Sequence, residues 1–245
     1  MKNLIKRECY QLRHNRCCLC GFVGIFLLGL LTADTYLDEM MGPAGGAAAN
    51  LADIMNGMVY DSTFVLILIS NLLALALGQE FGCRALDQQI AAGHSRRAVF
   101  ACKTAVYLMV FNLMALVYPL AGCIRELARF GIGNAAMFGG QAARAVVYSL
   151  LLNSGVFLLA VLFCICLQDA AKAAAVTAAV TFVVSLYLGY GMMLGLPVAW
   201  LPVYQIRQVV STTGWQQPTA LAVGAVWDGV LLCLAGAIFR RSDLK

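Results

Sequence analysis

The chain has 245 residues, of which 62% are hydrophobic and only 12% are charged, and its mean hydropathy is +0.81. A soluble globular domain carries about 25% charged residues, so this composition excludes that class and indicates a membrane protein. The net charge of +5 does not indicate a nucleic-acid partner, because no basic stripe carries interleaved aromatic residues. Basic residues along the edge of a lipid bilayer explain the excess better.

Six apolar segments of roughly 17–24 residues each match the thickness of the hydrocarbon core of a bilayer. In chain order the predicted spans cover residues 17–33, 62–78, 101–122, 145–167, 173–196 and 219–239. No internal repeat, low-complexity tract or long linker separates them. The sequence therefore predicts one all-α membrane domain over residues 1–245, with six transmembrane helices.

A basic tail precedes the first span and contains Lys2, Lys6, Arg7, Arg13 and Arg16. A basic tail followed by an apolar run also resembles a signal peptide. Leu31-Thr32-Ala33 is a poor small-residue cleavage site, and the apolar run is long. We therefore expect this segment to be retained as a span.

Three cysteines, Cys17, Cys18 and Cys20, cluster where the first span begins. Only His14 lies near enough in sequence to act as a fourth metal ligand, and two of the three cysteines are adjacent. We therefore expect acylation or packing here and predict no metal site. Most of the ten cysteines lie inside apolar runs, where free cysteine behaves as a small hydrophobic residue, so no disulfide framework is expected.

The loop after the first span, residues 34–61, has five acidic residues and no Lys or Arg, which predicts that it lies outside the cell. Its methionines are expected to serve in packing rather than as copper ligands; they are Met40, Met41, Met55 and Met58. Residues 123–144 are also expected outside, although they hold three arginines. Overall, 13 of the 17 Lys and Arg residues fall on the other side and 4 on this one, so both termini are predicted to be cytoplasmic.

A polar, charged segment, residues 80–103, separates the second and third spans. Leu86 and Ile90 are four residues apart and can share one face of a helix. Gly93 stands where a helix C-cap glycine would, and Ser95 can cap the helix that follows. The pattern predicts a short cytoplasmic helix, a turn and the start of another helix, although a plain solvated loop would also fit.

The loop between the fifth and sixth spans begins and ends with Trp200 and Trp215, as at a membrane–water interface. Between them, VYQIRQVV is predicted to form a short helix that lies on the outer surface or dips into it. In the sixth span, Asp228 costs about 2.5–3.5 kcal/mol at the centre of a bilayer, so it is expected to face the bundle interior or water. Its plausible partners, one each in spans two, three and four, are Asn71, Asn112 and Asn153. A role in a substrate pathway and a structural hydrogen bond both remain open for it.

Three features occur together in this chain. After the second span come an acidic residue, a short helix, a Gly-x-Ser-Arg turn and a basic residue that opens the third span: Glu80, the helix through Ile90, Gly93-His94-Ser95-Arg96 and Lys103. The layout has six spans, both termini on one side and an interfacial segment before the last span. The chain ends with Trp227, Gly236 and the tail Phe239-Arg240-Arg241-Ser242-Asp243-Leu244-Lys245.

In these features the chain resembles the membrane subunit of an ABC exporter of the ABC-2 permease type. It is most similar to the small six-span permeases of bacterial peptide-export and lantibiotic-immunity systems. The layout covers nearly the whole chain, whereas the motifs cover a small part of it. In one respect the chain departs from that family, because the coupling helix often carries Gly-Thr near its start, where this sequence has Arg84-Ala85.

The resemblance implies a segment that docks cytoplasmic ABC ATPase subunits, formed by Glu80, Arg84, Leu86, Ile90, Gly93, Ser95 and Arg96. It also implies a second permease protomer, identical or a sister subunit, in a bacterial cell membrane, and an antimicrobial or other amphipathic peptide as substrate. The chain has no Gly-x-x-x-x-Gly-Lys-Ser/Thr loop, so ATP and Mg²⁺ are expected on the ATPase. We expect no catalytic residue and no cofactor in this chain.

Two other classes of function compete with this one. An intramembrane protease needs two carboxylates or a serine with a base, and Asp228 is the only acid well inside a predicted span. A non-transporting scaffold or sensor subunit is harder to separate from a permease, because neither class has catalytic residues.

Overall fold

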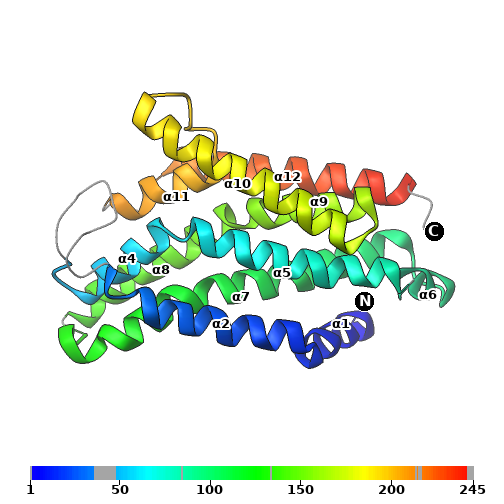
Figure 1. Ribbon diagram of the computed structural model, residues 1–245, viewed down its shortest axis with the longest axis horizontal. Coiled ribbons are helices and arrows are strands. Elements are labelled where there is room, and N and C mark those ends of the chain that lie inside the picture. The colour runs from blue at the N-terminus through cyan, green and yellow to red at the C-terminus, as the bar shows by residue number, and fades with distance from the viewer. Residues whose placement is uncertain are drawn as a thin grey trace.

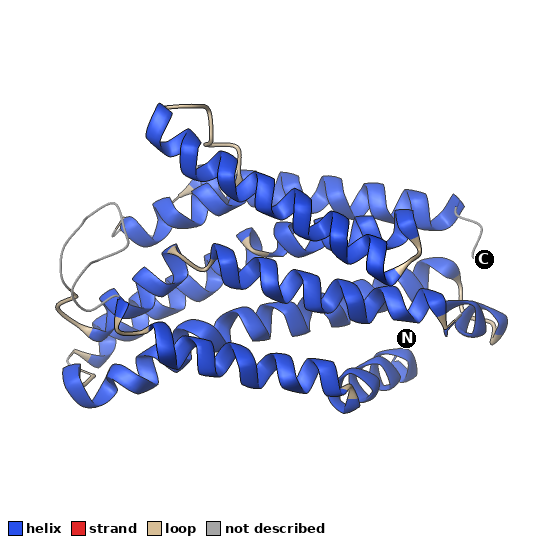
Figure 2. Ribbon diagram, viewed as in Figure 1, coloured by secondary structure: helices blue, strands red, loops and turns tan. Residues whose placement is uncertain are grey.

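A computed structural model describes residues 2–35, 48–83, 85–132, 134–212, 214 and 217–241. Within these ranges the chain is helical apart from short turns (Figure 2). In chain order the helices are α1 (Lys2–His14), α2 (Arg16–Thr32), α4 (Leu51–Tyr60), α5 (Thr63–Gly82), α6 (Ala85–Ala91), α7 (Arg96–Phe130), α8 (Ala135–Leu152), α9 (Ser154–Leu167), α10 (Ala170–Leu194), α11 (Pro202–Ser211) and α12 (Pro218–Arg241). The predicted all-α class is confirmed.

The long helices lie roughly side by side along one axis and form an elongated bundle (Figure 1). Five segments are long and apolar enough to cross a membrane by themselves: α5, α7, α8 with α9, α10 and α12. The pair α1 and α2, bent by 64° at Asn15, gives a sixth candidate. The protein is therefore a multi-span helical membrane protein with five to six candidate spans, as the sequence predicts.

The ends of the bundle depart from the sequence prediction. Residues 123–144 do not form a long loop, because α7 continues to Phe130 and α8 begins at Ala135. The charges that end the apolar run lie within the helix, where Glu126 is buried and pairs with Arg125. The helix thus extends past the end of the apolar run.

The expectation of a loop over residues 34–61 is also wrong in its second half. Leu51–Tyr60 forms α4, which begins with a capping box made by Asn50 and Asp53. Its inner face is buried against α7, α8 and α11, and this face includes Met55 and Met58, which therefore serve in packing. Met40 and Met41 lie outside the described residues.

The short helix predicted before the last span is confirmed as α11. It does not lie flat on the surface, because Ile206 and Val209 are buried among α4, α8 and α12. Arg207, on the same helix, is held by Tyr60 and Asp61 at the junction of α4 and α5. Thus α11 belongs to the bundle; Trp215 lies outside the described residues.

Small residues set the closest helix contacts. A Cβ atom added at Gly78 of α5 would lie 2.5 Å from the Cα atom of Ala170 in α10. A Cβ atom added at Gly29 of α2 would lie 2.5 Å from the carbonyl oxygen of Tyr118 in α7. Such backbone approach is typical of helix packing in membranes, where small residues allow the close van der Waals contact that holds helices together.

Candidate functional site

Helix α6 stands at the end of the bundle where the N- and C-terminal ends of the chain also lie (Figure 1). It connects α5 to α7 and is followed by Gly93, whose φ of 89° suits glycine and ends the helix. The side chain of Ser95 then accepts a hydrogen bond of 3.3 Å from the backbone N–H of Ala98 and caps α7. Both predicted caps are present.

The two apolar residues of α6 turn toward the bundle. Leu86 is only 2% exposed and Ile90 packs against the same core cluster. Both residues therefore hold α6 against the bundle and are not available on its exposed surface. Gln88 is exposed on the other side, and Asp87 is half-buried. A docking surface on α6 would consequently be polar; Arg84 lies outside the described residues.

Directly beneath α6 lies a buried cluster of charged and polar side chains. Lys103 of α7 donates one hydrogen bond to Glu80 of α5 and another, of 2.7 Å, to Glu8 of α1. The Tyr107 hydroxyl donates to Oε1 of Glu80 at 2.7 Å. The side-chain amide of Gln89, on α6, donates to Oε1 of Glu8 at 2.7 Å. We call these five residues the Lys103 cluster.

Every carboxylate oxygen in the Lys103 cluster accepts a hydrogen bond. Glu8 is fully buried, and Glu80 and Lys103 are nearly so. Ionic hydrogen bonds of this kind are roughly twice as strong as neutral ones, which offsets part of the cost of removing the charges from water. The cluster joins α7 directly to α1 and α5, and it joins α6 to α1 through Gln89, so α6 is connected to the two spans by way of Glu8 and Lys103.

Glu80 and Lys103 belong to one sequence motif, and they are in direct contact in the structure. Glu8, Gln89 and Tyr107 were not predicted as members of the site. A local signal for Glu8 does exist, since Leu4, Glu8 and Leu12 are four residues apart and all buried, so an acid interrupts the apolar row of α1. The sequence gives no corresponding signal for the partners of Glu8.

A polar cavity of about 160 Å³ opens beside the Lys103 cluster, lined in part by Gln11, Asn15, Gln79, Glu80 and Tyr107. It lies between α1 and the ends of α5 and α7. Of the two carboxylates, Glu80 is the one that borders this cavity. The cluster therefore has one polar edge, next to the junction of α1 and α2.

The intramembrane polar residues are not brought together as predicted. Asn71 donates to the backbone of its own helix at Ile67, and Asn112 donates to Leu108 and to the hydroxyl of Ser154 at 3.1 Å. Asn153, at the junction of α8 and α9, is buried with its side-chain oxygen unpartnered.

Within the described ranges, no hydrogen bond joins these asparagines to Asp228. Asp228 of α12 faces Gly155 of α9, and its Oδ1 atom is buried without a partner. A Cβ atom added at Gly155 would lie 3.4 Å from Oδ1, which is an ordinary van der Waals contact, so the two helices approach closely at this point. Asp228 is thus directed into a helix contact and not toward the asparagines proposed as its partners.

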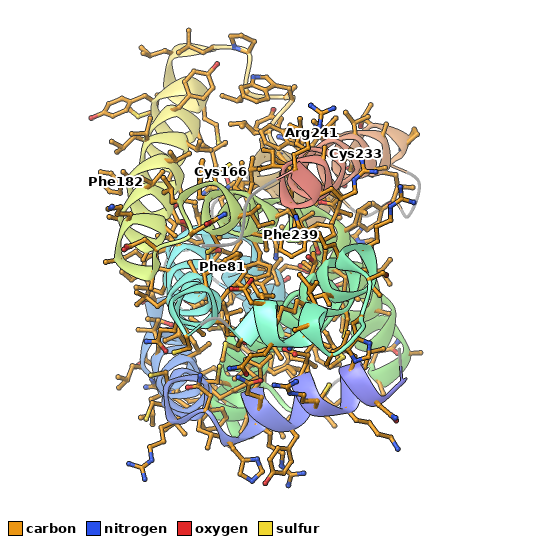
Figure 3. All side chains as sticks on the ribbon, turned by 90° about the vertical axis from the view of Figure 1, so that its right-hand side faces the viewer. Phe81, Cys166, Phe182, Cys233, Phe239 and Arg241 are labelled. Atoms are coloured by element: carbon orange, nitrogen blue, oxygen red, sulfur yellow. The ribbon has the colours of Figure 1, made fainter. Side chains whose placement is uncertain are left out.

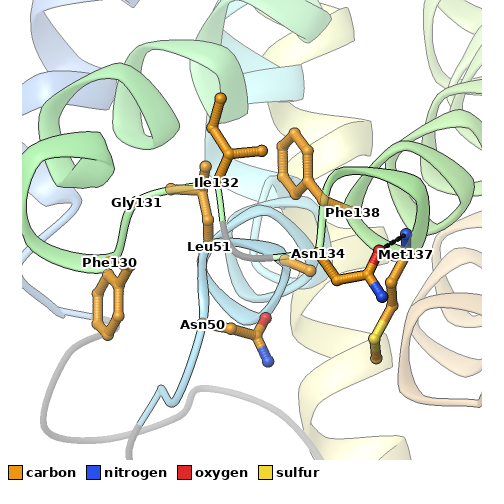
Figure 4. Close-up of a pocket in the computed structure, with 9 residues that line it drawn as sticks. Asn50, Leu51, Phe130, Gly131, Ile132, Asn134, Met137 and Phe138 are labelled. Atoms are coloured by element: carbon orange, nitrogen blue, oxygen red, sulfur yellow. Dashed lines mark hydrogen bonds between the residues drawn. The ribbon is translucent and has the colours of Figure 1, made fainter.

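At the opposite end of the bundle, a cavity of about 90 Å³ lies between the starts of α4 and α8 (Figure 4). Phe130, Ile132 and Phe138 contribute its apolar lining. Asn50 and Asn134 border it, but each caps its own helix, Asn134 by accepting from Met137 N at 3.2 Å. Among the described residues that line this cavity, none is titratable.

The arginines at this opposite end have structural partners. Arg125 pairs with Asp34 and Glu126, and Arg144 donates to the carbonyl of Gly214 at 3.1 Å. Arg207 bonds the carbonyl of Tyr60 at 3.1 Å and lies 3.6 Å from Asp61, and Arg129 stacks over Phe130. Burial raises the pKa of the Asp61 carboxyl, and the Arg207 guanidinium opposes that rise. The sequence predicts this end to lie outside the cell, where few Lys and Arg residues are expected. The contacts above give each of these four arginines a structural role there.

Among the described residues, no group of three His, Cys, Asp or Glu side chains is placed to hold a metal ion. Cys18 is buried, whereas Cys17 and Cys20 are exposed on α2. No protein-family model matches the chain, and no curated protein is significantly similar to it in sequence.

Proposed function

We propose that this protein is the permease subunit of an ATP-binding cassette exporter and that α6 is its coupling helix. The observation that carries the proposal is the Lys103 cluster, in which Gln89 of α6 bonds to Glu8 and Glu8 bonds to Lys103, which also pairs with Glu80. A force applied to α6 would reach α7 and α5 through this chain of buried hydrogen bonds and through the packing of Leu86 and Ile90. Such rigid-body transmission is how helical transporters change access.

The orientation of the chain follows from its charges. Of 17 Lys and Arg residues, 13 fall in the segments that the sequence predicts on the side of α6 and both termini, which we assign to the cytoplasm. The other four are held by structural contacts at the opposite end. This orientation puts α6 where a cytoplasmic ATPase can reach it.

The remaining parts of the proposal rest on the family resemblance. The ATPase is a separate polypeptide that holds ATP and Mg²⁺, since this chain has no phosphate-binding loop of the Walker type. A second permease protomer completes the pathway, and the substrate is an antimicrobial or other amphipathic peptide. The protein acts in the cell membrane of a bacterium.

The test is purification of the tagged chain in mild detergent, with mass spectrometry of the proteins retained. We expect a stoichiometric Walker-motif ATPase whose hydrolysis rate changes when the permease is present. A chain that carries only partners without ATPase motifs would instead support the scaffold or sensor function.

A further inference from the structure

Helix α1 has two faces of opposite character. Leu4, Glu8 and Leu12 are buried and turn toward the bundle. Lys6 and Arg13 are seven residues apart, so they project together, two turns apart, from the face opposite that buried row. Both side chains are exposed. Figure 3 views this end of the bundle, with the ribbon of α1 along its lower edge.

The positive charge of this outer face is not compensated. Lys6, Arg7, Arg13 and Arg16 pair with no carboxylate anywhere in the described ranges of the chain. The only acid within α1 is Glu8, and it is bound to Lys103 on the other face. The helix therefore presents cations outward that no described acidic group neutralises.

The position of α1 determines what these cations can meet. Asn15 alone separates α1 from α2, and its side chain caps α2 by accepting from Cys17 N at 2.9 Å. The first span predicted from the sequence, residues 17–33, coincides with α2, so the 64° bend places α1 beside the end of that span, at the edge of the bilayer. Tyr10, which is 66% exposed, lies among the cations, and tyrosine favours the membrane–water interface.

We infer that the outer face of α1 binds the phosphate groups of anionic phospholipids. Clusters of Lys and Arg next to a span are the usual means of such binding, and the uncompensated charge here is complementary to an anionic surface. The same helix carries Glu8 into the Lys103 cluster, so lipid binding on one face favours the docked position of α1 on the other. Anionic lipid thereby stabilises the support of α6, whatever protein α6 contacts.

The experiment is hydrogen exchange of the full chain in nanodiscs of phosphatidylcholine alone and of phosphatidylcholine mixed with phosphatidylglycerol. The backbone amides of α1 and α6 are expected to exchange more slowly in the mixed lipid. Exchange of the α10 amides, remote from α1, should be the same in both. Raised salt should remove the difference, because screening weakens surface electrostatics.

A pair of matched variants assigns the effect to residues. Lys6→Gln with Arg13→Gln should weaken binding to the mixed lipid by about fivefold for each cation, roughly 25-fold for the two, and should reduce the slowing accordingly. Lys172→Gln with Arg241→Gln removes one Lys and one Arg exposed at the same end but not on α1, and should keep it. Equal exchange of wild-type α1 in the two lipids would overturn the inference.

A protein partner for this face would give a different result. The α1 variant would then lose retention of a co-purified protein, while α1 exchange in nanodiscs would not depend on lipid charge. That outcome also rejects the lipid assignment, and it does so without requiring that the proposed exporter function be correct. The salt titration on the wild-type chain keeps the test decisive even if the variant folds poorly.

Discussion

Lys103 is the residue on which the buried cluster depends. It is the single cation between two buried carboxylates, and Tyr107 and Gln89 add one neutral donor to each of them. A buried ionic group contributes little net stability when intact, but loss of one partner leaves uncompensated charge in a low-dielectric site. The cluster therefore serves mainly to fix the relative positions of the helices. It affects the free energy of unfolding strongly only when one of its members is removed.

The first prediction concerns Lys103→Met. This change leaves Glu8 and Glu80 facing each other without a cation, and it should destabilise the protein by about 3–5 kcal/mol. Thermal unfolding of the purified chain in detergent measures the effect, with the exposed Lys172→Met as the matched control. Adding Glu8→Gln to Lys103→Met should recover part of the loss, because one buried charge is removed. Strictly additive effects would contradict direct pairing.

At the scale of elements, helix pairs in this bundle are positioned by glycines. Gly78 lets α5 approach α10 until backbones touch, whereas Gly82, one turn later in α5, has no heavy atom near the position of a Cβ. The same contrast exists within α2, between Gly29 against Tyr118 and the open position at Gly24. Glycine is therefore required for helix packing only at the positions where another helix lies within contact distance, such as Gly78 and Gly29.

The second prediction follows from this contrast. Gly78→Ala should destabilise the protein by about 1–3 kcal/mol, because the added methyl meets the backbone of Ala170 and the helices must separate. Gly82→Ala should be neutral or slightly stabilising, since alanine has the higher helix propensity. Midpoints of thermal unfolding in one detergent compare the two, and equal midpoints would show that the α5–α10 contact is looser than described.

How far the sequence predicts these elements depends on whether the signal is local. The apolar runs of α5, α10 and α12, and the glycine and serine around α6, could be read directly. Helix α4 was missed because its acidic and small residues suggest a loop, whereas its burial comes from contacts with α7, α8 and α11.

The candidate site divides in the same way. Glu80 and Lys103 fall in one contiguous motif and could be named. Glu8 and Gln89 are 81 residues apart, so only the folded bundle brings them together. Leu86 was predicted as a docking residue, but its burial gives it a packing role, and the ATPase-docking role remains a prediction carried by the exposed face of α6.

At the scale of the whole molecule, the two ends of the bundle differ in kind. One end holds α6 and α1 (Figure 1), and the Lys103 cluster lies there between α1, α5, α6 and α7. The other end has helix caps, arginines engaged in structural contacts and a mainly apolar cavity. Helix α10 leans away from the bundle, and Met193 and Leu194 near its end are strongly exposed. This difference between the two ends fits the proposal that a partner protein contacts the end with α6.

The third prediction concerns orientation. Alkaline phosphatase fused after Gly131, at the turn between α7 and α8, should be active because that end is expected outside. The same enzyme fused after Gln168, at the turn between α9 and α10, should be inactive. The reverse pattern would place α6 outside the cell and rule out its contact with a cytoplasmic ATPase.

The most direct measurement of the central claim is site-specific photo-crosslinking in cells from Gln88, on the exposed side of α6. The matched control carries the same photo-reactive residue at Ala171, which is exposed at the start of α10 at the same end of the bundle. We expect a crosslink from Gln88 to a protein with Walker motifs, and a much weaker one from Ala171. If Gln88 is crosslinked only to lipid or to proteins without ATPase motifs, α6 is not a coupling helix and the exporter function is wrong.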